Sequence, residues 1–102
     1  MTQEYGYKLG SFRGYEFSLR VSASPSLDVV DDFAVTVYYS LSNGESKAIA
    51  RVDNAHGFVH FDRIYRRDQP KDPVDWTWQK AEGELRENWR QYAKSYDDAH
   101  GL

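Results

Sequence analysis

The chain has no cysteine among its 102 residues. That absence excludes a disulfide scaffold, thiolate catalysis and a cysteine-based zinc finger. No apolar run approaches the roughly 20 residues that a membrane-spanning helix needs. Residues 1–11 also lack the apolar core of a signal peptide. We therefore expect a cytoplasmic protein that makes no use of a membrane.

The chain also lacks a large excess of charge of one sign. Its 13 basic and 16 acidic residues leave a net charge of only −3. This balance argues against a surface that coats nucleic acid, which requires a strong positive field. The sequence contains no GxxxxGK, GxGxxG or GxSxG motif. It therefore gives no support to a nucleotide-binding loop or an α/β-hydrolase nucleophile, and we expect no cofactor.

Aromatic residues, in contrast, are abundant, with eight tyrosines, five phenylalanines and three tryptophans. Disordered chains typically lack such residues, and each aromatic ring buries a large apolar area. A chain of 102 residues is long enough for one modest core and too short for two. The sequence therefore predicts a single domain over residues 1–102.

Period-two alternation of apolar and polar residues predicts strands with one buried face. The predicted strands are residues 14–22, 33–41, 46–53 and 58–66. The dipeptide Asn43-Gly44 favours a two-residue type I′ hairpin turn, because both residues accept positive φ angles. Residues 1–13 precede the first strand as an N-terminal extension.

The hairpin loops set a register that can be checked against the apolar pattern. A two-residue loop at Asn43-Gly44 gives facing pairs that are all apolar or aromatic: Tyr39–Ala48, Val37–Ala50 and Val35–Val52. A slip of one residue would turn every side chain to the other face. A four-residue loop at 54–57 then continues the same apolar face through the last strand, in Val59, Phe61 and Tyr65. The opposite face receives Ile49 together with the polar residues.

Residues 72–97 are predicted to form a C-terminal helix, with Asp72 as its cap and Pro73 at the first helical position. Its apolar stripe recurs at three- and four-residue steps: Trp78, Ala81, Leu85, Trp89, Tyr92 and Tyr96. Gly83 within the helix predicts a close approach to the sheet. The predicted fold is α+β, a four-stranded antiparallel meander-like sheet with one C-terminal helix packed on its apolar face.

A polar cluster is predicted on the other face of the sheet. In the register above, Arg51 lies across from His60, with Cβ atoms about 5 Å apart. Asp62 follows His60 by two residues and therefore shares its face. Tyr38 lies on the neighbouring strand, and His56 belongs to the turn between the last two strands.

This cluster suggests metal-independent cleavage of RNA by acid–base chemistry. His60 would transfer protons, because the unperturbed pKa of histidine lies near neutrality. Asp62 or Asp53 would orient the imidazole, and Arg51 would neutralise a phosphate. The predicted catalytic residues are thus His60, Asp62 and Arg51, and the predicted supporting or binding residues are Asp53, His56 and Tyr38.

Two other interpretations use the same residues. His56, His60 and Asp62 offer nitrogen and oxygen donors to a metal, but an HxxxH pair shares a face only on a helix. Arg51 would also repel a cation, so no metal site is predicted. A purely structural histidine in a hairpin fits the same pattern, because a fold does not determine its site.

Residues 49–66, with the sequence IARVDNAHGFVHFDRIYR, resemble an R-x-D-N-x-H-G-x-x-H-x-D signature of small uncharacterised prokaryotic proteins. Residues 80–96 resemble the helix that closes those proteins, and a more distant similarity is to the TumE-like proteins of toxin–antitoxin pairs. The resemblance covers residues 49–96 and singles out Arg51, Asp53, Asn54, His56, Gly57, His60 and Asp62. It implies a toxin–antitoxin component that acts on RNA.

A non-catalytic protein-binding module is the alternative, such as an antitoxin or a mobile-element-encoded inhibitor of a nucleic-acid-processing system. Tyrosine and tryptophan are frequent in interface hot spots, and exposed edge strands permit dimerisation by strand addition. The expected partner is another protein or a second copy of the chain. RNA is the candidate substrate of the catalytic alternative.

Overall fold

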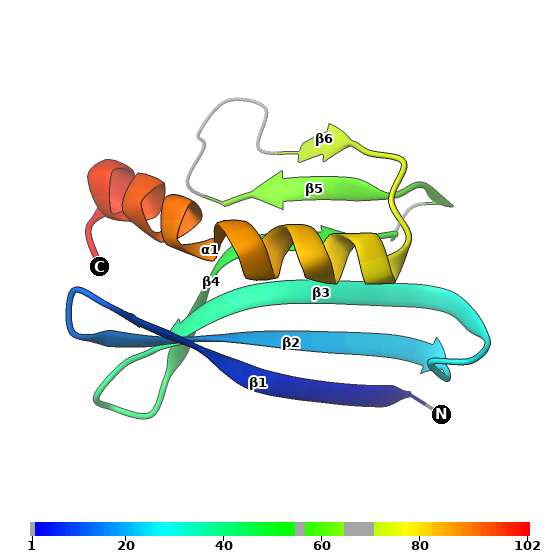
Figure 1. Ribbon diagram of the computed structural model, residues 1–102, viewed down its shortest axis with the longest axis horizontal. Helices are drawn as coiled ribbons and strands as arrows, with labels where there is room; N and C mark the ends of the chain where they lie inside the picture. The colour runs from blue at the N-terminus through cyan, green and yellow to red at the C-terminus, as the bar shows by residue number, and fades with distance from the viewer. Residues whose placement is uncertain (1, 55–56, 65–70) are drawn as a thin grey trace.

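The computed structural model describes residues 2–54, 57–64 and 71–102. Its elements are β1 (Gln3–Phe12), β2 (Tyr15–Pro25), β3 (Val30–Ser40), β4 (Ser46–Asp53), β5 (His60–Arg63), β6 (Lys71–Pro73) and α1 (Trp78–His100). The strands form one antiparallel sheet in sequence order, and α1 lies across one face of it (Figure 1). The predicted α+β meander with one C-terminal helix is confirmed. No helix in the described part of the chain is long and apolar enough to span a membrane.

Within the described residues the sheet has six strands rather than the predicted four. Residues 3–12, predicted as part of an extension, form the edge strand β1 and turn Tyr5, Tyr7 and Leu9 towards the core. Glycines are depleted in strands, and Gly6 and Gly10 within this segment conceal its alternation. At the other edge, residues 71–73 form β6, where a proline is tolerated because edge strands leave N–H positions unpaired.

The helix begins at Trp78 and not at the predicted residue 72. Thr77 is the N-cap, because its Oγ1 accepts a hydrogen bond of 3.2 Å from the backbone N–H of Lys80. The helix ends at His100, three residues later than predicted, and the N–H of Gly101 donates to the carbonyl of Asp97. Four residues of the predicted apolar stripe are buried: Ala81, Leu85, Trp89 and Tyr92. Its end members Trp78 and Tyr96 are half-buried, and Ala93, which was not predicted, is buried as well.

The hairpin between β3 and β4 has a three-residue loop instead of the predicted two-residue turn. The N–H of Gly44 donates to the carbonyl of Leu41, and the N–H of Leu41 donates to the carbonyl of Glu45. Gly44 has a φ of +87°, whereas Asn43 stays outside the positive-φ region that a type I′ turn requires. The longer loop shifts the register by one residue, so that Tyr39 faces Lys47 rather than Ala48.

A bulge then cancels this shift. The register changes between the pairs Tyr38–Ala48 and Val37–Ala50, which leaves Ile49 as the extra residue on β4. The predicted pairs Val37–Ala50 and Val35–Val52 are therefore confirmed. Ile49 is fully buried in the core, and its predicted place on the polar face is wrong.

The core lies between α1 and the adjacent sheet face, and aromatic rings make its main contacts. The ring of Trp89 lies 5.1 Å from that of Phe17, and the ring of Tyr92 lies 5.5 Å from that of Phe61. Gly10 has a φ of +152°, and a Cβ at this position would lie 3.0 Å from Cζ2 of Trp89. The backbone of β1 thus approaches the indole at a glycine.

Gly83, in contrast, marks no close approach, so that prediction is wrong. Apart from the adjacent backbone of the helix itself and the two neighbouring residues, a Cβ added there would meet no described atom within 4 Å. Glycine in a helix interior is about 1 kcal/mol less favourable than alanine. We expect Gly83→Ala to raise the free energy of unfolding by about this amount in urea titrations. Gly10→Ala should lower it, and a loss of stability in Gly83→Ala would contradict the open surroundings of this position.

Buried tyrosines predict a loss of stability at alkaline pH. Burial raises the pKa of Tyr39 from 10.0 to about 12, and the neighbouring Tyr96 is the second cause of this rise. Because the folded state disfavours the phenolate, this contribution to stability is complete below pH 10 and declines as the pH approaches 12. We expect urea titrations to show this decline, and Tyr39→Phe to lose about 2 kcal/mol less between pH 9 and 12. Equal losses in both proteins would contradict the assignment.

Candidate functional site

The sheet face opposite α1 is polar, and within the described residues no helix or second sheet packs on it (Figure 1). Its side chains form two rows across β1 to β5. One row holds Glu4, Ser22, Ala34, Asp53 and His60, and the next holds Gly6, Arg20, Thr36, Arg51 and Asp62. We call these two rows the open face.

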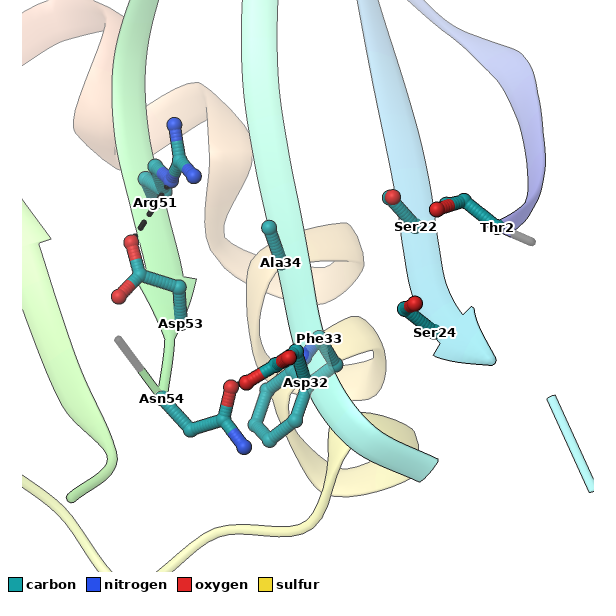
Figure 2. Close-up of a pocket in the computed structure, with 9 residues that line it drawn as sticks. All are labelled: Thr2, Ser22, Ser24, Asp32, Phe33, Ala34, Arg51, Asp53 and Asn54. Atoms are coloured by element: carbon teal, nitrogen blue, oxygen red, sulfur yellow. Dashed lines mark hydrogen bonds and ion pairs between the residues drawn. The ribbon is translucent and has the colours of Figure 1, made fainter. Parts of the chain in front are cut away.

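A hollow of about 230 Å³ lies at one end of the open face (Figure 2). It is lined by Thr2, Ser22, Ser24, Asp32, Phe33, Ala34, Arg51, Asp53 and Asn54. Figure 2 shows Arg51 and Asp53 on β4, with the serines across β3 on β2 and α1 behind the sheet. Hydroxyl, carboxylate, amide and guanidinium groups thus meet around one small space.

Asp53 contacts both Arg51 and His60 through its carboxylate. Its Oδ2 lies 2.8 Å from Nε of Arg51, and its Oδ1 lies 3.1 Å from Nε2 of His60. Arg51 precedes Asp53 by two residues and so lies on the same face of β4. His60 on β5 is the register partner of Asp53. Asp53 is only 8% exposed, whereas the Arg51 side chain is 47% exposed. The carboxylate therefore holds one accessible guanidinium in place.

His60 is buried, with 3% of its surface exposed. Its ring lies 5.5 Å from the ring of Phe58, which precedes β5. The described lining of the hollow includes Arg51 and Asp53 but not His60. The imidazole contacts Asp53 from the neighbouring strand β5 and is not among the described residues that line the hollow.

The predicted register between β4 and β5 is wrong by two residues. Arg51 faces Asp62 rather than His60, and Asp53 faces His60. The predicted four-residue loop is too short, because β5 begins only at His60. A shift of two residues keeps every side chain on its face, so the polar set is right while its cross-strand partners are wrong.

The structure brings three of the six predicted site residues together: Arg51, Asp53 and His60. Asp62 is half-buried, and no hydrogen bond or ion pair between described residues links it to Arg51 or His60. Tyr38 lies further along β3, where the guanidinium of Arg20 sits 5.5 Å from its ring centre. His56 lies outside the described residues.

Asn54, which the R-x-D-N signature singled out without giving it a role, positions the rim of the hollow. Its Oδ1 accepts a hydrogen bond of 2.9 Å from the N–H of Phe33, and its Nδ2 donates to the carbonyl of Asp31. The side chain thereby joins the start of β3 to the end of β4. Ser22 and Ser24 were also missed, although their alternation with the apolar residues of β2 was a signal for this face.

The described residues contain no group of three or more histidine, cysteine, aspartate or glutamate side chains placed to hold a metal ion. What the site offers is one partly exposed guanidinium, fixed by a buried carboxylate and surrounded by hydroxyl and amide groups. Such a set can bind a polar group by hydrogen bonds and charge.

Comparison with known proteins gives a family but no described activity. The family model described as "Domain of unknown function (DUF7718)" matches residues 1–102. No curated protein matches the chain. No solved structure matches it either.

Proposed function

The chain belongs to the DUF7718 family, whose function is unknown, and we propose that it is a non-catalytic module that binds a protein partner on the open face. The observation that carries this proposal is the hollow around Arg51 on a sheet face that no described helix or strand covers. In contrast, the apolar stripe of α1 is buried in the core. The open face therefore presents its polar groups around a hollow.

Burial of His60 favours binding over catalysis. A general acid or base must come within hydrogen-bond reach of the proton it transfers. The imidazole is 3% exposed, and its Nε2 already contacts Asp53. Acid–base cleavage of RNA would require His60 to leave this position, whereas binding through Arg51 requires no rearrangement.

The charge of the site favours a protein over a nucleic acid. The chain carries a net charge of −3, and the described lining of the hollow places Asp32 and Asp53 beside Arg51. Binding to a phosphate backbone depends on several uncompensated cations. A mixed set of hydroxyls and both signs of charge is instead typical of the polar parts of protein interfaces. An antitoxin or an inhibitor of a nucleic-acid-processing system would use such a surface.

The proposal is tested by blocking the hollow. Ser22→Arg places a long charged side chain at the lining of the hollow, and Gln91→Arg makes the same charge change on the exposed side of α1. Tagged proteins would be purified from the cells that naturally make this chain, and their co-purifying proteins quantified. We expect a specific protein to be retained by wild type and Gln91→Arg and depleted at least tenfold by Ser22→Arg.

Equal retention by Ser22→Arg and Gln91→Arg would contradict binding through the open face. A separate experiment tests the catalytic alternative: purified wild type and His60→Gln are each incubated with cellular RNA. Cleavage by wild type that disappears in a folded His60→Gln protein would establish acid–base chemistry. We expect no such difference.

A further inference from the structure

A second hollow adjoins the first on the open face and contains two arginines. Its volume is about 300 Å³, and its lining residues are Glu4, Arg20, Ser22, Ala34, Thr36 and Arg51. Ser22, Ala34 and Arg51 line both hollows, so the two lie side by side on the same sheet face. Arg51 therefore reaches both spaces.

The sheet register places Arg20 and Arg51 on either side of Thr36. Thr36 on β3 faces Arg20 on β2 and Arg51 on β4. Neighbouring strands lie about 4.8 Å apart, so the two arginine Cα atoms are roughly 10 Å apart. Long flexible side chains on one face at this spacing can converge on a single small anion.

Each guanidinium keeps donors available for a ligand. Arg51 contacts Asp53 through Nε, and its terminal nitrogens point away from that carboxylate (Figure 2). Arg20 lies over the ring of Tyr38 and makes no ion pair with a described residue. An aromatic ring leaves the edge of a stacked guanidinium open for hydrogen bonding.

We propose that Arg20 and Arg51 clamp a carboxylate of the protein partner above Thr36. This inference rests on the proposed function and names the group that the open face recognises. The planar fork of arginine matches the two oxygens of a carboxylate. Glu4 in this hollow and Asp53 beside it would repel the repeated phosphates of a nucleic acid but leave room for one anionic group. The ligand is therefore an aspartate or glutamate side chain, or a chain terminus.

The clamp is tested by nuclear magnetic resonance, through the Nε–Hε signals of arginine. Purified protein is titrated with a tetraglutamate peptide and, separately, with a tetrauridylate oligonucleotide. We expect saturable shifts of the Arg20 and Arg51 signals with the peptide, in the millimolar range typical of a single weak contact. Arg20→Gln and Arg51→Gln should each weaken peptide binding at least fivefold.

Lys47→Gln is the matched control, because it removes one positive charge from an exposed position of β4 outside both hollows. Its affinity for the peptide should stay within twofold of wild type. Absence of shifts at both arginines, or equal weakening by Lys47→Gln, would overturn the clamp. A response to the oligonucleotide alone would identify a nucleic-acid site instead. If co-purification still depends on Ser22 while the peptide fails to bind, the clamp falls and the proposed function stands.

Discussion

Replacing Asp53 with alanine is expected to lower the free energy of unfolding by about 2 to 4 kcal/mol. The carboxylate is 8% exposed and accepts contacts from Nε of Arg51 and Nε2 of His60. Its removal deletes both contacts and leaves a small void between β3 and β5. The loss would be measured by urea denaturation at neutral pH, with the fold checked by circular dichroism.

Asp62→Ala is the matched control for this experiment. Asp62 occupies the same face and lies directly opposite Arg51, yet no ion pair joins these two described residues. We expect a change of less than about 1 kcal/mol, as for most substitutions outside a buried network. A larger loss in Asp62→Ala than in Asp53→Ala would show that the sequence-predicted pairing, and not the one described above, organises the site.

Replacing Trp89 with alanine is expected to cost about 3 to 5 kcal/mol, the range for large aromatic residues in cores. The indole is 6% exposed, packs 5.1 Å from the ring of Phe17, and covers the backbone at Gly10. Its loss opens a cavity between α1 and two strands. In a domain of about 100 residues, this corresponds to a fall in melting temperature of more than about 12 °C.

Gln91→Ala serves as the control on the same helix, because Gln91 is exposed. Alanine is a slightly better helix former than glutamine, so its stability should match or slightly exceed that of wild type. A loss below about 1 kcal/mol in Trp89→Ala would contradict the packing of α1 on the sheet.

Local alternation predicted the core-facing residues of β2 and of most of β3, because a strand places side chains on its two faces with a period of two. Phe17, Leu19, Val35 and Val37 are all buried as their alternation predicts. The helix stripe followed in the same way from three- and four-residue spacing. These patterns depend only on neighbouring residues and on the geometry of one element.

Loop geometry could not be predicted in the same way, because it depends on contacts across the chain. The turn at Asn43-Gly44 is one residue longer than the dipeptide suggested, and the bulge at Ile49 removes the resulting shift. The longer loop and the bulge thus cancel. The observed register of the buried pairs matches the predicted one only because both features are present.

The site was predicted in composition but not in arrangement. Arg51, Asp53 and His60 were all identified, but the longer connection after β4 makes Asp53 rather than Asp62 the partner of the histidine. His60 is also buried, which the alternation of β5 did not predict. Asn54 was missed as a positioning residue because its contacts reach residues about twenty positions earlier in the chain.

Site-specific photo-crosslinking tests the role of the open face most directly. A photoreactive residue would replace Ser18, which lies on the same side of β2 as Arg20 and Ser22, or Gln91 on the exposed side of α1. In cells that naturally make the chain, we predict one discrete crosslinked protein from position 18 and none from position 91. Crosslinks from position 91 alone, or from neither position, would contradict binding through the open face.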